Sequence, residues 1–498
     1  MSMDQVASGF GRSANYRDII IAAVVVEVAV FKGIKMRYTS LRLQISNHIV
    51  LTKQTLYTLL AGACLSLSTV LMAGSGDSAT TYGLGPINVG SAMAFSPFQS
   101  DAWAVYYNPA AMTRSTEGQI AVVMQHGEQE LRAASLGGNA PLARAGDVLS
   151  DQSSQLLLLG VKTTLSGALS GGDDYSFGLN IGVDEHANNF LPYSASTSRE
   201  GQFLRYESQP LYLALAGAKR SFLPGIDVGI GARLTLSATA SLDAVSDLAG
   251  NTDSESLSLN AEPSLTPIIG VNIRPQKLFC GSSDCLPELL NDSEVALFWR
   301  GDAEYEVSVD ANVVIPGVVP APGLDLVIVT LDSYQPEVIG AAILIPVGKF
   351  ELVGSLEQQK WSELGEKFAG DTVRNQAALR FKDISVPRLG VSYQWNERLK
   401  LIGGISKEDS PLKGNRSQDV NYFDVDKVLI GVGASYRFNR VPGMSLPVEV
   451  GLGYQFQMLD ERDFELTNIN SPTDPAPYET VRVDGDIHVL SASLALRF

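Results

Sequence analysis

Residues 448–458, Val-Glu-Val-Gly-Leu-Gly-Tyr-Gln-Phe-Gln-Met, alternate between large apolar side chains and small or polar ones. This period of two is typical of a β-strand whose two faces meet different surroundings. Residues 425–438, 175–184 and 226–234 show the same alternation. A helix would instead gather its apolar residues at every third or fourth position. The sequence therefore predicts an all-β body for this chain.

About fourteen such strands are predicted after residue 115. They are 116–126, 155–165, 174–186, 202–219, 225–243, 256–273, 293–310, 334–345, 349–361, 375–395, 398–408, 425–438, 446–460 and 481–498. Some connections are short turns, such as Val347-Gly348, whereas the alternate connections, such as 127–154 and 461–480, are long and polar. An even strand number with this asymmetry is typical of an antiparallel β-barrel in the bacterial outer membrane. A closed barrel also pairs every backbone donor and acceptor within the membrane.

The composition agrees with strands that turn one face to lipid. The chain has 498 residues, of which 45 % are hydrophobic and 18 % are charged. The body nevertheless contains no run of about 20 apolar residues, which a membrane-spanning helix needs. The formal charge is −17, and it becomes −21 without residues 1–73. Nucleic acid is not expected as a partner, because binding to phosphates needs a basic face.

Both ends of the chain favour export to the outer membrane. Lys53 precedes an apolar run, 56–71, which is the pattern of a signal peptide. We expect cleavage between Ala73 and Ala79, so that residues 1–73 are removed. At the other end an apolar face runs to the terminal Phe498. Such an end is typical of the closing strand that the barrel-assembly machinery reads, although an ordinary soluble strand could also end in this way.

One substantial segment of the mature chain lies outside the predicted wall. Residues 101–112, Asp-Ala-Trp-Ala-Val-Tyr-Tyr-Asn-Pro-Ala-Ala-Met, are apolar and break at Asn108-Pro109, so they form neither a plain helix nor a central strand. We predict that residues 74–115 form a hatch that plugs the lumen, and that 116–498 form the barrel. The candidate substrate contacts in the hatch are Phe95, Phe98, Trp103, Val105 and Tyr107. The alternative is that these side chains only pack the hatch onto the wall.

Two further predictions concern short segments, one with a pair of cysteines and one rich in proline. Cys280 and Cys285 are the two cysteines of the predicted mature chain, and they favour a disulfide over a zinc site because no histidine lies near them. No metal or cofactor is predicted.

Residues 312–322 contain Ile315, Val318 and Val319 among prolines, which favours an outer loop with an apolar surface for capturing substrate. These three residues could instead cap the barrel or touch lipid.

Several short motifs occur in an order that suggests a family. Residues 83–115 carry Gly85, Gly90, Ala92, Asp101 and Tyr107-Asn108-Pro109-Ala110. The second half adds residues 331–340, Trp361-Ser362, Phe381-Lys-Asp383, Leu389-Gly390, Tyr393, Gly403-Gly404, Asp409-Ser410-Pro411, Asp424-Val-Asp426-Lys427, Gly431-Val-Gly433 and Tyr436. This series, with Asn108, Pro109 and Ala110 as the hatch motif, resembles the FadL/TodX family of outer-membrane transporters for long-chain fatty acids and other hydrophobic compounds.

The resemblance implies a mechanism of uptake without an energy source or covalent chemistry, and therefore a protein that is not an enzyme. Hydrophobic molecules such as fatty acids or aromatic hydrocarbons would be captured between outer loops and would bind against the hatch. They would leave sideways into the membrane through a kink in the third strand, for which Gly178 and Gly182 are candidates. The surrounding partners would be outer-membrane lipid and lipopolysaccharide.

Two other functions stay open at this point. A barrel enzyme of the lipase or protease type would need a base, and the predicted mature chain offers His126, His186 and His488 in no recognisable nucleophile motif. A general porin would need an open lumen rather than a hatch. If the substrate carries a carboxylate, Arg114 or Arg233 is the candidate partner.

Overall fold

The computed structural model describes residues 77–138, 152–165, 174–185, 211–246, 252–281, 285–315, 319–369, 380–418, 423–467, 477 and 479–498. The predicted leader, residues 1–73, therefore lies outside the described residues. Within the described ranges, no helix is long and apolar enough to cross a membrane.

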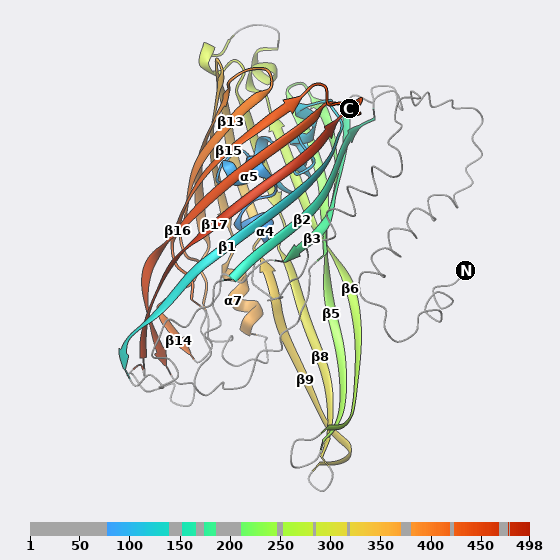
Figure 1. Cartoon of the computed structure of the whole chain (residues 1–498), viewed down its shortest axis with the longest axis vertical. Coiled ribbons are helices and arrows are strands. Elements are labelled where there is room, and N and C mark those ends of the chain that lie inside the picture. Colours follow the sequence, from blue (N-terminus) through green and yellow to red (C-terminus); the bar gives the residue numbers. More distant parts are fainter. Residues whose placement is uncertain are drawn as a thin grey trace, which may run out of the picture. The chain divides into compact units, whose positions relative to one another are not determined.

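Fourteen strands close into one antiparallel barrel (Figure 1). They are β1 (Gln119–Gly138), β2 (Gln152–Thr164), β3 (Tyr175–Glu185), β4 (Leu211–Leu223), β5 (Ile226–Ser246), β6 (Thr252–Ile273), β7 (Glu294–Arg300), β10 (Val338–Val347), β11 (Phe350–Gln359), β12 (Ile384–Gln394), β13 (Leu399–Glu408), β15 (Lys427–Phe438), β16 (Val448–Thr467) and β17 (Glu479–Arg497). Closure occurs where β1 pairs with β17, beginning at Gln119 opposite Arg497. The predicted fold class and strand number are confirmed.

The alternation along the strands separates an apolar outer face from a polar inner face. In β16, Leu452 and Tyr454 are 55 % and 38 % exposed on the outside, whereas Gln455 and Gln457 are fully buried on the inside. In β3, Phe177 is exposed on the outer face in the same way. An outer face of this kind suits lipid, and a lumen lined by small and polar residues can hold a plug.

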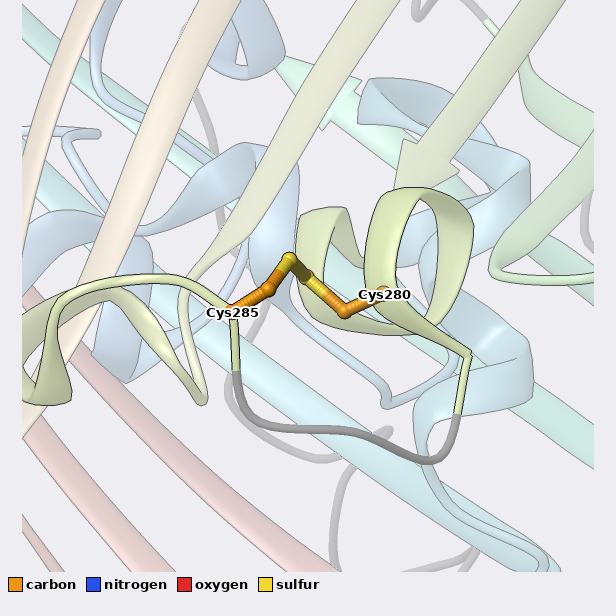
Figure 2. Close-up of a disulfide and its surroundings, with 2 residues drawn as sticks. All are labelled: Cys280 and Cys285. Carbon is orange, nitrogen blue, oxygen red and sulfur yellow. A yellow bond between two sulfur atoms is a disulfide. The ribbon is translucent and has the colours of Figure 1, made fainter.

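The two ends of the barrel differ as predicted. The turns β4–β5 and β10–β11 lie at the same end as Phe498, and each places a glycine, Gly225 or Gly348, at a positive φ. The long connection 274–293 lies at this end too. It contains a helical turn, Gln276–Cys280, and the disulfide between Cys280 and Cys285, whose Cα atoms are 5.6 Å apart (Figure 2). The predicted disulfide is thus present.

The predicted strand 293–310 is wrong in one respect, because it is two strands. β7 ends at Arg300, and the chain turns at 301–302 into β8 (Ala303–Ile315), which forms a hairpin with β9 (Val319–Gln335) and runs parallel to β5. This hairpin continues past the barrel at the end opposite Phe498 (Figure 1).

The hairpin also corrects the expected irregular loop at 312–322. Pairing continues from Asn312 opposite Asp325 to Ile315 opposite Val319, with a shift in register between Val313 and Ile315. Pro320 and Pro322, which cannot donate to a ladder, lie between the paired positions Val319 and Leu324. Val318 lies outside the described residues.

The same end of the barrel carries two further elements. Helix α7 (Ser362–Ala369) lies between β11 and β12, and the short strand β14 (Arg416–Gln418) pairs with the extension of β16.

Short helices of the hatch lie inside the barrel (Figure 1). They are α4 (Ser78–Thr81), α5 (Pro86–Gly90), η1 (Ser96–Phe98), α6 (Ala104–Tyr107) and η2 (Pro109–Arg114). Asn108 separates the last two with an extended backbone, φ −158° and ψ 94°. This conformation is expected before a proline, which disfavours the helical region for its predecessor. On the wall, η2 contacts β3 to β6, and α5 contacts β13 and β15 to β17.

Candidate functional site

The hatch touches the wall closely because the wall presents glycines to it. A Cβ atom added at Gly431 would lie 2.5 Å from the carbonyl oxygen of Val89, and one added at Gly404 would overlap the carbonyl of Ser91. Only a residue without a side chain permits this approach of two backbones. The hatch therefore meets the wall backbone to backbone on this side of the lumen.

The motif Asn108-Pro109-Ala110 docks on the opposite side of the lumen. The side-chain NH₂ of Asn108 donates to the carbonyl of Pro97 at 2.8 Å and to Oδ1 of Asn272 on β6 at 2.6 Å. Gly270 leaves the room for this side chain. All three residues of the motif are buried. The motif thus ties two turns of the hatch to each other and to the wall.

The predicted substrate contacts of the hatch all lie inside the barrel and are buried, with exposed fractions of at most 4 %. Trp103, Val105 and Tyr107 belong to one apolar cluster with the wall, and Phe95 and Phe98 belong to another. The hydroxyl of Tyr107 donates to the carbonyl of Ala79 at 2.7 Å and accepts from the N–H of Leu84 at 2.8 Å. In this conformation these side chains pack the hatch against itself and the wall, and a role in binding substrate stays a prediction.

The third strand brings one of its glycines against the hatch. A Cβ atom at Gly178 would overlap Val105 and lie 2.8 Å from the sulfur of Met112. At Gly182 it would instead overlap the backbone of β2. The pairing of β3 with β2 and β4 runs past both glycines without a shift in register. A sideways opening at these positions stays a prediction.

An apolar cluster lies in the outer connections and strand extensions, and we call it the outer cluster. Its members are Leu131, Tyr334, Leu364, Phe381, Leu412, Phe423, Val425, Phe464, Val481 and Val483. Trp361 packs against it, with its ring centroid 6.0 Å from that of Tyr334. A cavity of about 20 Å³ borders the cluster, next to Phe423 and Lys427. Buried apolar side chains are thus concentrated on the outer side as well as at the hatch.

Buried ion pairs surround the hatch between the wall strands. Arg233 of β5 lies 2.6 Å from Asp77 of the hatch and also contacts Gln335. Arg300 and Arg388 share Glu357, at 3.4 and 2.9 Å. Charges removed from water need partners of this kind, because unpaired charges in a membrane-enclosed lumen are costly.

A hydrogen-bonded carboxylate and one more ion pair lie on the wall near the hatch. Asp184 of β3 accepts hydrogen bonds from the N–H and the hydroxyl of Ser78, at 3.0 and 2.7 Å. Lys427 of β15 pairs with Glu408 of β13 at 2.8 Å.

The two arginines expected to bind a carboxylate are already paired. Arg233 meets Asp77, and Arg114 meets Glu294 at 2.7 Å and the carbonyl of Phe98. The prediction did not include Arg300 and Arg388, which are 4 % and 3 % exposed. The sequence could have indicated that Arg388 faces inward, because Arg388 follows Ile384 and Val386 at every second position of one strand.

The histidines show no catalytic arrangement in the described part of the chain. His488 lies on β17, where its ring contacts the hydroxyl of Tyr454 at 2.6 Å and the carboxylate of Asp486 at 2.9 Å. His126 is exposed on β1, and His186 lies outside the described residues. The described ranges also hold no group of three or more side chains suited to a metal ion.

Comparisons with known proteins by sequence and by structure agree on one family of proteins. A family model described as outer membrane protein transport protein (OMPP1/FadL/TodX) matches residues 341–498. Alkane uptake protein A of Marinobacter nauticus is 40 % identical over 444 residues, which cover 88 % of this chain and 95 % of that protein.

Two crystal structures share the fold at low sequence identity. A FadL homologue of Pseudomonas aeruginosa has a TM-score of 0.53 at 14 % identity, covering 86 % of this chain and 99 % of its own. The toluene transporter TodX of P. putida has a TM-score of 0.50 at 11 % identity, covering 84 % of this chain and 99 % of its own. With its closed fourteen-stranded barrel and its lumenal hatch, this chain belongs to the FadL/TodX family of outer-membrane proteins that transport hydrophobic compounds.

Proposed function

We propose that this protein takes up long-chain alkanes through the outer membrane by passive transport. The observation that carries this proposal is the 40 % identity to a protein named for alkane uptake, over almost the full length of that protein. The apolar clusters at the hatch and at the outer side support it, because an uncharged hydrocarbon needs apolar surface along its path. Aromatic hydrocarbons are the second candidate substrate class, as in TodX.

The path begins outside the membrane. A hydrocarbon crosses the polar lipopolysaccharide layer poorly, so an apolar surface beyond the membrane lowers the free energy of capture. The outer cluster and the hairpin of β8 and β9 are the candidate sites for capture, and the predicted capture residues are Ile315, Val318 and Val319. From there the substrate moves to the apolar and aromatic side chains of the hatch, Phe95, Phe98, Trp103, Val105 and Tyr107. It then leaves sideways beside Gly178 and Gly182 of β3.

Binding at the hatch requires part of the hatch to move, since its aromatic side chains are buried. The end of the hatch is held to the wall. Lys162 donates to the carbonyls of Ser115 and Glu117 at 2.5 and 2.7 Å, and Arg220 donates to the carbonyl of Thr113 at 3.0 Å. We propose that the movement falls on the hatch residues before Thr113 and breaks contacts such as that of Asn108 with Asn272.

The other two functions fit the lumen less well. A general porin needs a water-filled passage, whereas the hatch backbone touches the wall at Gly404 and Gly431. A barrel enzyme needs a positioned nucleophile and base, and His488 meets a tyrosine and a carboxylate instead. We therefore propose a transporter without catalytic activity.

The surroundings of the barrel follow from its location. Its apolar outer face meets outer-membrane lipid, and its outer rim meets lipopolysaccharide. Phe498 offers the barrel-assembly machinery a terminal aromatic residue. In the folded barrel its backbone pairs with Gly118 in both directions, at 2.7 and 3.1 Å.

The proposal is tested by alkane binding and by uptake of labelled hexadecane into cells that produce the full chain. Replacing Trp103 by alanine removes a buried ring at the hatch, and we expect binding to weaken by about tenfold, as for loss of a large aromatic contact. The matched control is Trp395→Ala, because Trp395 is 58 % exposed. Equal binding by both variants and the unaltered protein would remove the hatch aromatics from the site. Absence of hexadecane uptake by the unaltered protein would refute the proposed function.

A further inference from the structure

A groove crosses the outer face of the wall, where β6, β7, β10 and β11 lie side by side. Its volume is about 470 Å³, which is within the usual size of a ligand pocket. Apolar side chains form most of its lining, and Gln358 adds an amide at one end. The outward-facing apolar residues of the lining include Ile269, Leu297, Trp299, Ile339, Ala341 and Leu356.

The groove exists because Ala341 is small where its outward-facing neighbours are large. Ala341 pairs with Leu297 on β7 and with Leu356 on β11. On its own strand it lies between Ile339 and Ile343, and all four of these large neighbours are exposed. Side chains on one face of paired strands stand next to one another, so the short side chain leaves a depression between longer ones.

The floor of the groove is closed toward the lumen. Phe298 and Gly340 belong to the inward-facing rows of β7 and β10, and both border the groove. The buried ring of Phe298 covers Gly340, because a Cβ atom added at Gly340 would overlap this ring. A molecule therefore reaches the groove from the membrane and not through the lumen.

The groove lies in the outer half of the apolar band. β10 and β11 meet at the turn Val347-Gly348, at the end of the barrel that carries Phe498 (Figure 1). Strand residues rise about 3.3 Å each and barrel strands tilt by about 40°, so Ala341 lies about 15 Å and Ile339 about 20 Å from this turn. The apolar band of such a barrel is about 25 Å tall. The groove therefore faces the outer leaflet, which consists of lipopolysaccharide in the bacterial outer membrane.

Hydrocarbon chains are the molecules that meet this groove, because it opens to the membrane. A lipid chain there is already out of water, so the hydrophobic effect adds little to its binding. The gain comes from dispersion contacts, which a chain in the groove makes with the wall on several sides instead of one. An empty groove would forfeit these contacts. The shape of the wall thus favours one chain at a fixed position.

The rim beyond the groove carries charges of both signs. Lys360 continues the outward-facing row of Leu356 and Gln358. Its ammonium group lies 3.8 Å from Asp383, and its N–H donates to the carbonyl of Glu337 at 2.9 Å. A head group meets a balanced rim here, so the affinity of the site comes mainly from the chain.

We infer that the groove across β6, β7, β10 and β11 binds one acyl chain of a lipopolysaccharide molecule in the outer leaflet. The chain lies beside Ala341, between Leu297 and Leu356. The site is separate from the path of the transported compound, since Phe298 closes it toward the lumen. It does not rest on the proposed uptake function.

The test uses the folded full chain in detergent and three probes: deep-rough lipopolysaccharide, dipalmitoyl phosphatidylethanolamine and hexadecane. Native mass spectrometry measures how much of each probe stays bound. Ala341→Phe fills the groove with a ring, and we expect lipopolysaccharide binding to weaken by about tenfold, because the chain loses its contacts there. Leu356→Ala removes one wall and should weaken binding by about threefold for the same reason. Migration in unheated gel samples shows that each variant is folded.

The matched control is Ala492→Phe. Ala492 pairs with Met124 and Leu452, two exposed outer-face residues, and lies on β17, away from the groove. This variant should bind lipopolysaccharide as the unaltered protein does. Equal binding by Ala341→Phe and Ala492→Phe would overturn the inference, and so would unchanged binding by Leu356→Ala.

The other two probes test the choice of ligand. Tighter binding of phosphatidylethanolamine than of lipopolysaccharide would overturn the choice of lipid. Loss of hexadecane binding alone in Ala341→Phe would assign the groove to the transported compound and overturn the inference. Uptake of hexadecane by cells is measured separately, so failure of the lipid site leaves the proposed function in place.

Discussion

At the scale of single residues, Asp101 makes docking of the hatch depend on pH. Burial raises its pKa from 3.8 to about 6, against the opposing effect of Arg497. Because the pKa of Asp101 is higher in the folded protein than in the unfolded chain, Asp101 lets the protein keep its full stability below about pH 4. That stability is lost as the pH rises through about 6. Asp101→Asn, which can still accept the N–H of Trp103, should therefore stabilise the protein at about pH 8, by about 3 kcal/mol, and not at about pH 4. Thermal unfolding at both pH values measures this, and an equal gain at both would contradict it.

Asp77 limits where the predicted leader could be removed. Its carboxylate accepts the N–H of Thr80 at 2.9 Å, which caps α4, and pairs with Arg233 at 2.6 Å. Cleavage after Asp77 would leave Arg233 without its carboxylate partner. Of the predicted window from Ala73 to Ala79, we therefore expect the part before Asp77 to be used. N-terminal sequencing of protein purified from outer membranes checks this, and a first residue beyond Asp77 would contradict it.

At the scale of elements, the contact between the end of α5 and the wall depends on one of two neighbouring glycines. A Cβ atom at Gly404 would overlap the carbonyl of Ser91, whereas one at Gly403 would have its nearest neighbour 3.7 Å away. Gly404→Ala should loosen the hatch, at a cost of about 1–3 kcal/mol, and raise ion conductance in planar bilayers. Gly403→Ala is the matched control and should behave like the unaltered protein. Equal conductance in the two variants would show that this contact does not seal the lumen.

The elements also show what a sequence can and cannot predict here. Strands β15 and β16 were predicted well because their alternation is local and each face meets one environment along its length. The break between β7 and β8 was missed, since alternation continues on both sides of 301–302. The pairing of Arg300 with Glu357 could not be predicted. Arg300 and Glu357 are 57 residues apart and lie on different strands. Their pairing depends on the register of those strands across the curved wall, and alternation does not specify that register.

At the scale of the whole molecule, the barrel wall closes without help from the hatch. β1 and β17 pair from Gln119 opposite Arg497 to Gly138 opposite Glu479, and no hatch residue takes part in this ladder. The lumen wall behind the hatch includes Gln455 and Gln457, whose amides water can solvate once the hatch is gone. Deletion of residues 77–115 should therefore leave a folded barrel with a wet lumen.

Because the wall closes independently of the hatch, we expect deletion of the hatch to raise ion conductance strongly. The intact protein should pass little ion current in a planar bilayer, because the hatch backbone touches the wall at Gly431 and Gly404. The variant without residues 77–115 should give a steady, porin-like current, while its migration in unheated gel samples stays that of a folded barrel. A folded deletion variant that conducts no better than the intact protein would place the barrier elsewhere, with the outer cluster as the next candidate. A steady current through the intact protein would instead mean that the hatch does not close the lumen.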